Sequence, residues 1–189
     1  MTTAAAIDSI IDNKIKWDLY YYNICKAVGS NSRCLSRNIG AIIVKDKSIV
    51  STGYNGPPRG IPHCGTDRIR YDYKLSEIYN KKHISAAEAK DFEQSCPRKV
   101  LGYNPGERLD MCTAVHAEVN CIINAGRLGV SILEGTMYMN SVIACRECMK
   151  VIINAGITEL VVESMEFYDL QAEFLLKHSN LRVRTFRRE

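Results

Sequence analysis

The sequence has no long apolar run and no strong excess of charge of either sign. None of its hydrophobic stretches approaches the roughly 20 residues that cross a bilayer, so we expect no membrane span. The net charge is only +4 over 189 residues, and the basic residues are scattered except near the C-terminus, which argues against nucleic-acid binding. The C-terminal cluster is expected to be a solvated end and consists of Arg182, Arg184, Arg187 and Arg188.

Internal repeats and low-complexity segments are also lacking, and the length fits one domain with a core that needs no disulfides. The first ten residues, MTTAAAIDSI, do not predict a secretory leader, because they are too short and have no basic region. The eight cysteines are therefore expected to be reduced thiols in the cytoplasm, where metal binding is a better interpretation than disulfides. Cys25 and Cys121 fall within helical patterns and are predicted to be small core residues.

Two short motifs carry the chemistry of the chain. His116-Ala117-Glu118 opens one apolar helical pattern, and Cys145 and Cys148 open another. One imidazole and two thiolates make a three-ligand zinc site, which leaves the fourth tetrahedral position for water. Zinc lowers the pKa of such water toward neutrality. Glu118 lies two residues from the ligand His116, so it is placed to move protons without binding the metal.

Each motif alone is weak, because a His-Ala-Glu triplet is common and an isolated C-x-x-C can be redox-active or structural. Here both occur in order, about 30 residues apart, with a strand-like segment between them. Both cysteines also fall in the first turn of a predicted helix, where the dipole favours the thiolate that zinc needs. The combination predicts a catalytic zinc site of His116, Cys145 and Cys148 with Glu118 beside it.

The remaining periodicity predicts an α/β fold in which helices cover a mixed sheet. A charged and turn-rich excursion at about residues 67–111 interrupts the alternation, and its first part, from Asp67 to about Ala89, has irregular helical spacing. The predicted helices are 14–29, 114–128, 146–154 and 169–178, and the predicted strands are 39–44, 48–54, 135–140, 157–163 and 181–186.

Three segments together resemble the cytidine-deaminase-like superfamily, and within it the deoxycytidylate (dCMP) deaminases. They are His116-Ala117-Glu118-Val119-Asn120, Cys145-x-x-Cys148 and Gly53-Tyr54-Asn55-Gly56. The first two mark the superfamily, whereas Gly53–Gly56, the following Pro62-His63-Cys64 and the Asn120 position indicate the dCMP branch. The resemblance covers about residues 14–186. It implies a single domain, folded as a three-layer α/β/α sandwich around a five-stranded mixed sheet.

The resemblance also implies an activity, the hydrolysis of dCMP to dUMP and ammonia. In this activity Glu118 takes a proton from water, protonates N3 of the base and helps the amino group to leave. The sequence departs from the family at one position, because Ala144 stands where a proline usually precedes the first ligand cysteine. Proline presets the turn into a helix, so we expect a less rigid loop here and the same ligands.

Four further thiols, Cys34, Cys64, Cys96 and Cys112, fall in predicted loops. In a reducing compartment they suggest a second, closed zinc site with a structural role, and free loop cysteines are the alternative. The resemblance favours Cys34, Cys64 and Cys112 as ligands. The fourth ligand is open between Cys96 and the two histidines His63 and His83.

The resemblance further implies substrate and effector contacts. Asn55 and Tyr168 are expected to bind dCMP, in a homohexamer that dCTP activates and dTTP inhibits, with Mg²⁺ accompanying the triphosphate. The loop from Asn55 to Gly60 offers backbone N–H groups and Arg59 for phosphates. Arg127, near the end of the catalytic helix, is a candidate for coupling between subunits. The alternatives are a solvated loop charge and a cation favoured by the helix dipole.

Other functions remain open at this point. The same zinc chemistry serves deaminases of tRNA adenosine, free cytosine or a pyrimidine precursor of riboflavin. The modest charge argues against tRNA, and a riboflavin-type enzyme would usually carry a reductase domain as well. A non-catalytic, zinc-stabilised interaction module is the alternative from another class. Glu118 discriminates between a deaminase and such a module, because a structural zinc site has no use for an acid that does not bind the metal.

Overall fold

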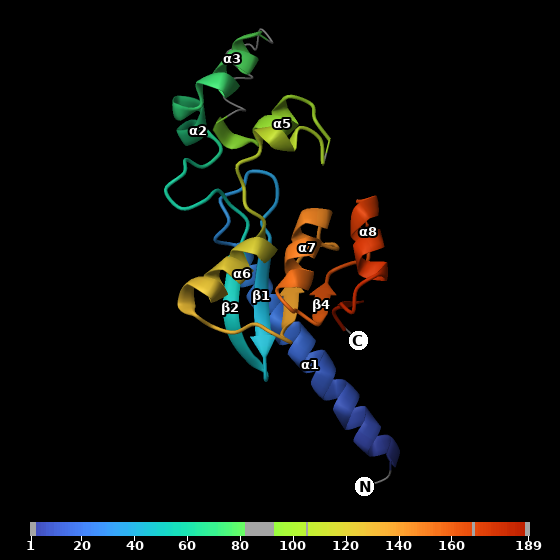
Figure 1. The fold of residues 1–189 in the computed structure, drawn as a ribbon. Helices are drawn as coiled ribbons and strands as arrows, with labels where there is room; N and C mark the ends of the chain where they lie inside the picture. Colours follow the sequence, from blue (N-terminus) through green and yellow to red (C-terminus); the bar gives the residue numbers. More distant parts are fainter. Residues whose placement is uncertain (1–2, 82–92, 105, 168, 188–189) are drawn as a thin grey trace. The chain divides into compact units, whose positions relative to one another are not determined.

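The computed structural model describes residues 3–81, 93–104, 106–167 and 169–187, and they fall into two compact units (Figure 1). The first unit, formed by residues 1–31, 39–54 and 116–189, contains the sheet. The second unit comprises residues 32–38 and 55–115, so it is wider than the excursion expected at about 67–111. Among the described residues, no helix is both long and apolar enough to cross a membrane.

The sheet of the first unit has five strands in the order β2-β1-β3-β4-β5. β1 pairs antiparallel with both β2 and β3, whereas β3, β4 and β5 run parallel. This arrangement confirms the predicted five-stranded mixed sheet. The strands are β1 (Gly40–Lys45), β2 (Ser48–Tyr54), β3 (Thr136–Met139), β4 (Glu159–Val162) and β5 (Arg182–Thr185).

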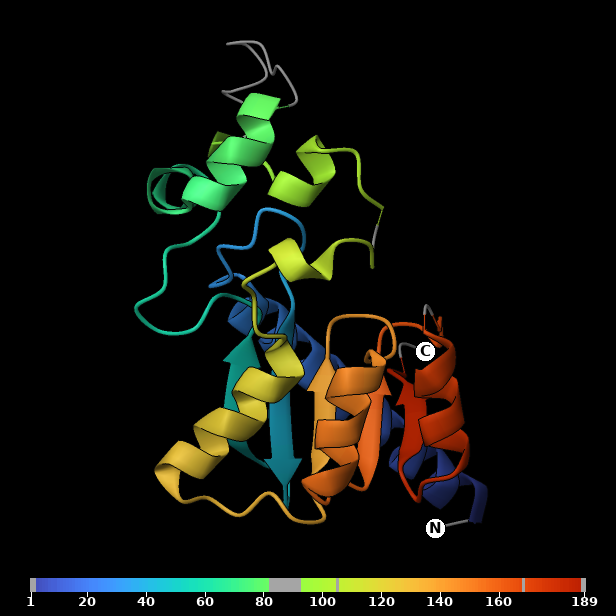
Figure 2. The same ribbon diagram turned by 45° about the horizontal axis from the view of Figure 1, so that its top comes forward.

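Helices cover both faces of this sheet, as Figure 2 shows. α6 (Ala117–Leu128), α7 (Arg146–Asn154) and α8 (Leu170–Lys177) lie on one face, and α1 (Thr3–Gly29) lies on the other. The predicted three-layer α/β/α sandwich is thereby confirmed. α1 begins at Thr3, well before the expected start at residue 14, and its leading alanines favour helix by propensity.

Alternating side chains divide the core into two apolar layers. Ala41 and Ile43 of β1 pack with α6 and α7, in a cluster that includes Met149 and Ile152. The intervening residues of β1 face α1, where Ile42 packs with Tyr21, Cys25, Tyr138 and Phe186. Both predicted core cysteines, Cys25 and Cys121, are fully buried, which confirms that assignment.

Within the C-terminal basic cluster, Arg182 and Arg187 are exposed as predicted, but Arg184 is not a solvated charge. Arg184 lies in β5, and its two guanidinium nitrogens donate to the carboxylate of Asp18 at 2.6 and 3.0 Å. Glu159 lies 3.4 Å from the same guanidinium group. Asp18 is on α1, 166 residues away, so no local pattern indicated this partner. Arg188 lies outside the described residues.

The second unit contains short helices and a 3-10 turn. They are α2 (Thr66–Tyr71), α3 (Tyr73–Lys81), α5 (Pro97–Val100) and η1 (Leu109–Met111). They enclose a small core of Leu75, Tyr79, Leu101 and Met111. The helical part expected to reach about Ala89 is divided between α2 and α3, and residues 82–92 lie outside the description.

Candidate metal centre

His116, Cys145 and Cys148 come together at the starts of α6 and α7. His116 is the residue before α6, Cys145 is the residue before α7, and Cys148 lies in the first turn of α7. His116 Nδ1 lies 3.6 Å from Cys145 Sγ and 3.3 Å from Cys148 Sγ. Over the part of the chain that the structure describes, no other three His, Cys, Asp or Glu side chains gather their ligand atoms this closely.

These distances fit a tetrahedral zinc ion. With Zn–S near 2.3 Å and Zn–N near 2.0–2.1 Å, a sulfur and a nitrogen ligand in a tetrahedron lie about 3.6 Å apart. The three ligand atoms all lie within 4.8 Å of one another, so they can meet around one ion with little movement. Three protein ligands leave one coordination position open, which is the pattern of catalytic rather than structural zinc.

The two thiols of the cluster ionise differently. The neighbouring Cys148 thiol and then the His116 ring favour the thiolate of Cys145 and lower its pKa to about 4. The interaction with Cys145, and then burial, raises the pKa of Cys148, so the metal-free pair shares one proton. Zinc needs both groups as thiolates, and its binding therefore releases the proton held by Cys148.

Glu118 lies in the first turn of α6, and its side chain is buried, with only 4% of its surface exposed. It is not one of the three clustered metal ligands, although it interacts with the Cys148 thiol. Burial raises the pKa of the Glu118 carboxyl, because a low-dielectric environment disfavours the charged form. A carboxyl whose neutral form is made accessible in this way suits a group that both accepts and returns a proton.

The helix that carries His116 and Glu118 packs tightly against β2. Gly53 faces α6 so closely that a Cβ atom there would lie 2.6 Å from the carbonyl oxygen of Ala117 and 2.7 Å from the Cα of Cys121. Ser51 Oγ donates to the Cys121 carbonyl at 2.6 Å in the same seam. The resemblance named Gly53 only as part of a loop motif, and the structure shows that its role includes this close approach.

Two asparagine side chains complete the seam between β2 and α6. Asn120 Nδ2 donates to the carbonyl of Tyr54, and Asn124 Nδ2 donates to that of Thr52, both at 2.8 Å. β2 is an edge strand, so these carbonyls have no neighbouring strand to pair with. Asn120 and Asn124 lie four residues apart on one helical face, and the accepting residues lie two apart on the strand. The bonds therefore fix the register of α6 along β2.

Asp169 supports α7 from the neighbouring helix and was missed by the sequence reasoning. It caps α8 by accepting from Gln171 N at 3.0 Å, and its second oxygen accepts from Arg146 N, in the first turn of α7, at 3.2 Å. The sequence did contain one signal for this capping role, an aspartate directly before a helical pattern. With this support α7 starts at Arg146 as predicted, although Ala144 replaces proline.

The four other predicted thiol ligands all lie in the second unit. Burial raises the pKa of Cys64, and the charges of Cys96 and Cys112 raise it further, while Arg68 Nη1 lies 3.8 Å from its sulfur. With Cys34 they form no set of three ligand atoms as close as the first cluster, so the second zinc site stays a prediction. The buried Nδ1 of His63 has no hydrogen-bond partner among the described residues. His83 lies outside those residues.

The predicted substrate and effector residues have varied surroundings. Asn55 is buried, and its Nδ2 donates to the carbonyl of Arg37 at 2.8 Å. Gly60 has a positive φ of 80°, next to the exposed Arg59, and Arg127 is exposed in the last turn of α6. Tyr168 lies outside the described residues. The roles of all five stay predictions.

Solved structures with the same fold define the class of this protein. A dCMP deaminase from the cyanophage S-TIM5, in complex with dCMP and dUMP, aligns with a TM-score of 0.58 at 21% identity, over 89% of this chain and 95% of that one. A diaminohydroxyphosphoribosylaminopyrimidine deaminase/reductase from Thermotoga maritima aligns with a TM-score of 0.52 at 15% identity, over 90% and 36% of the two chains. The fold is therefore the cytidine-deaminase-like fold.

The sequence comparison identifies the family. Residues 15–164 match the family described as the cytidine and deoxycytidylate deaminase zinc-binding region, and the chain belongs to this family. A deoxycytidylate deaminase of Enterobacteria phage T4 is 34% identical over 153 residues, which cover 77% of this chain and 76% of that protein. The Saccharomyces cerevisiae deoxycytidylate deaminase is 28% identical over 90% of this chain. The chain spans about half the length of the two yeast relatives, 45% and 44%.

Proposed function

We propose that this protein is a zinc-dependent deaminase that hydrolyses dCMP to dUMP and ammonia. The observation that carries the proposal is the joint presence of three clustered ligands, His116, Cys145 and Cys148, and a buried acid, Glu118, that is not among them. Relatives from phages and yeasts named deoxycytidylate deaminase support the choice of dCMP over other bases.

Among the residues of this chain, Glu118 carries out the proton transfers of the reaction. When bound by His116, Cys145 and Cys148, zinc supplies Lewis acidity and lowers the pKa of water. Glu118 accepts a proton from the attacking water, delivers it to N3 of the cytosine ring, and later helps to protonate the departing amino group. One water is consumed and one ammonia is released, so protons and atoms balance. The buried position of Glu118 keeps bulk water from competing for these protons.

The test compares two glutamate variants in adjacent helices. Glu118→Gln keeps the shape of the side chain and removes its proton transfer, so the rate should fall by about 10²–10⁴ with zinc retained. Glu147→Gln is the matched control, because Glu147 is 65% exposed in α7 and pairs with Lys150 on the surface. Ammonia release from dCMP, CMP, deoxycytidine and cytosine should be measured with each protein, together with its zinc content.

The outcomes separate the alternatives. A zinc-loaded wild-type protein that releases ammonia from none of the four compounds would favour the non-catalytic interaction module. Preference for another compound would keep the deaminase and reject dCMP. Activity of Glu118→Gln above about a hundredth of wild type would contradict the assigned mechanism.

Regulation is a finer part of the proposal: a homohexamer activated by dCTP and inhibited by dTTP, each with Mg²⁺. It is supported by the exposed loop residue Arg59 beside Gly60, and by the exposed Arg127 on the helix that starts at His116. Such control requires effectors that bind active and inactive states with different affinity. We expect sigmoidal dependence on dCMP that becomes hyperbolic with dCTP and shifts to higher concentrations with dTTP. Hyperbolic kinetics indifferent to both nucleotides would leave an unregulated enzyme.

A structural zinc in the second unit is the remaining part of the proposal. The partnerless buried nitrogen of His63 supports it, since His63 adjoins Cys64 in sequence and no described residue bonds that nitrogen. Elemental analysis should give two zinc ions per chain, and one should persist in His116→Ala. Cys64→Ser should lower the thermal stability, because metal binding there is also folding energy. One zinc per chain in fully reconstituted protein would reject this site.

A further inference from the structure

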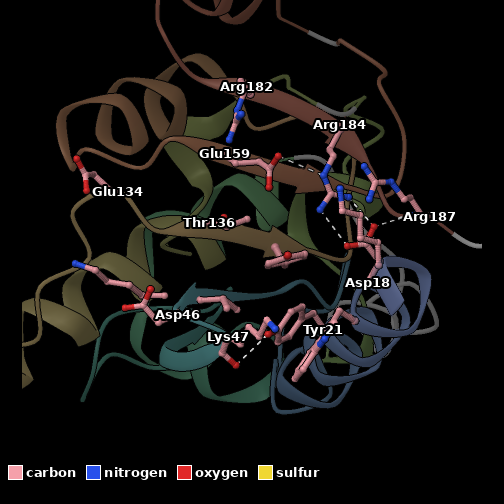
Figure 3. A pocket seen from close by; sticks show the side chains of 15 residues that line it. Asp18, Tyr21, Asp46, Lys47, Glu134, Thr136, Glu159, Arg182, Arg184 and Arg187 are labelled. Atoms are coloured by element: carbon pink, nitrogen blue, oxygen red, sulfur yellow. Dashed lines mark hydrogen bonds and ion pairs between the residues drawn. The ribbon is translucent and has the colours of Figure 1, made fainter. Parts of the chain in front are cut away.

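A pocket of about 600 Å³ lies on the α1 side of the sheet, away from the helices that carry the metal ligands (Figure 3). Its wall comes from α1, from the turn between β1 and β2, and from the first residues of β3, β4 and β5. His116 and Cys145, by contrast, lie on the side of α6 and α7. The pocket is therefore separate from the proposed active site.

The floor of the pocket is a fixed ion-pair network. Asp18, whose side chain is only 3% exposed, accepts from two nitrogens of Arg184 and from the backbone N–H of Arg187. Glu159 lies 3.4 Å from Arg184 on the other side. Arg184 carries one positive charge and the two carboxylates carry two negative charges, so this network has a net charge of about −1. Asp18, Glu159 and Arg184 therefore shape the pocket without giving it a strong charge.

The rim of the pocket has an unbalanced positive charge. Two of its carboxylates, Asp46 and Glu134, have no ion-pair partner within the described part of the chain. The same is true of five cations, which therefore outnumber them: Lys14, Lys45, Lys47, Arg182 and Arg187. Over the whole lining, six Lys and Arg side chains outnumber four carboxylates, and this net charge of about +2 favours anionic ligands.

Aromatic rings form the inner wall of the pocket. Trp17 stacks on Tyr21 at 5.4 Å between ring centroids, and Tyr21 contacts Tyr138 at 4.7 Å. Lys47 Nζ lies 5.9 Å from the centre of the Trp17 ring. The pocket thus presents cations beside an apolar surface, and its volume falls in the range of about 300–1,000 Å³ typical of small-molecule sites.

We propose that this pocket binds a small phosphorylated anion. Its phosphate oxygens accept hydrogen bonds from the rim cations, chiefly Arg182 and Arg187, because guanidinium groups match the geometry of phosphate. The non-phosphate part of the ligand packs against the wall of Trp17 and Tyr21. The site is independent of the proposed deaminase activity, and either one can fail without the other.

Trp17 provides a direct test, because it is the only tryptophan in the chain. Inorganic phosphate and inorganic tripolyphosphate should be titrated into the zinc-loaded protein at constant ionic strength, with NaCl as compensation. A saturable change in tryptophan emission reports binding beside Trp17. Calorimetry of the same titrations counts the sites, and a zinc assay afterwards verifies that tripolyphosphate has not removed the metal.

The double variant R182Q/R187Q should weaken binding by about tenfold or more, since two charge-assisted contacts are lost. The matched control K74Q/K177Q removes two exposed cations from α3 and α8, outside the pocket, and should bind as wild type. Calorimetry should count one site fewer for R182Q/R187Q. An emission change that never saturates, or an affinity that R182Q/R187Q shares with wild type, would overturn the proposal.

Discussion

Replacing Gly53 with alanine is expected to destabilise the protein and weaken its metal centre together. The new Cβ would lie 2.6 Å from the Ala117 carbonyl oxygen and 2.7 Å from the Cys121 Cα, where ordinary contacts begin at 3.4 Å. Both obstacles are backbone atoms of α6, so no side chain can rotate away. The helix must therefore move from β2 by about 1 Å.

Two contributions determine how much Gly53→Ala lowers the free energy of unfolding. Inserting a methyl group into a packed seam costs typically about 1–3 kcal/mol. Displacement also strains the bonds from Asn120 and Asn124 to β2, each worth about 1 kcal/mol. If the strain costs about half of the two bonds, the sum is about 2–4 kcal/mol, which for a chain of this size corresponds to roughly 5–15 °C in Tm. His116 moves with α6, so zinc affinity should fall as well.

Gly126 provides the matched control, because it lies in the same helix and a Cβ added there would meet nothing within 4 Å. Gly126→Ala should stabilise the protein by about 0.5–1 kcal/mol through helix propensity. Thermal unfolding and zinc competition with a chelator measure both properties in both variants. Unchanged Tm and zinc affinity in Gly53→Ala would refute the reasoning, and a loss of similar size in Gly126→Ala would show a general intolerance instead.

Three further perturbations test other parts of the structure. Asp18→Asn should reduce the free energy of unfolding in urea by about 3 kcal/mol, because it leaves the partly buried Arg184 with a weaker partner; no change would reject the network. Asn120→Ala combined with Asn124→Ala should cost about 1–3 kcal/mol and lower zinc affinity, and unchanged affinity would argue against their positioning role. In zinc-free protein the pKa of Cys145, lowered to about 4, predicts alkylation by iodoacetamide that rises through about pH 4 and is already maximal near pH 6, as peptide mapping would show.

The first and the third of these experiments have an internal comparison. Asp46→Asn removes an exposed carboxylate that is in no ion pair among the described residues, and it should leave stability nearly unchanged. Cys121 is the comparison for alkylation, because burial raises its pKa to about 12 and shields it from the reagent. Equal labelling of Cys121 and Cys145 near pH 6 would contradict the assigned ionisation.

Local patterns predicted the elements of this protein well, and they pointed to the three side chains that cluster at the candidate metal centre. Alternating apolar residues indicated all five strands within one or two residues, and helix 146–154 was predicted with its observed bounds. This clustering could be predicted because zinc requires few residue types at fixed short spacings. Asp18 and Arg184, in contrast, are separated by 166 positions, and nothing near either residue indicates the other.

The same difference between local patterns and long-range packing explains which contacts at the candidate metal centre were not predicted. Gly53 is a motif glycine in sequence, but its contact with α6 exists only after the strand and the helix have packed. The carbonyls bound by Asn120 and Asn124 likewise become unpaired only because β2 is at the sheet edge. Such roles depend on strand order, which hydrophobic periodicity does not determine.

The backbone pairing between Gly56 and Val115 has an evolutionary consequence. Gly56 N donates to Val115 O at 3.0 Å, and Val115 N donates to Gly56 O at 2.8 Å. The two ends of the segment between these residues are therefore held together by backbone hydrogen bonds. Lengthening a flexible loop closed in this way costs little, about 0.6 kcal/mol for each doubling. Insertions and deletions can therefore accumulate inside the segment without altering the chain that leads into His116. Ancestral lineages could thus diverge in length here while inheriting the same metal-binding sheet.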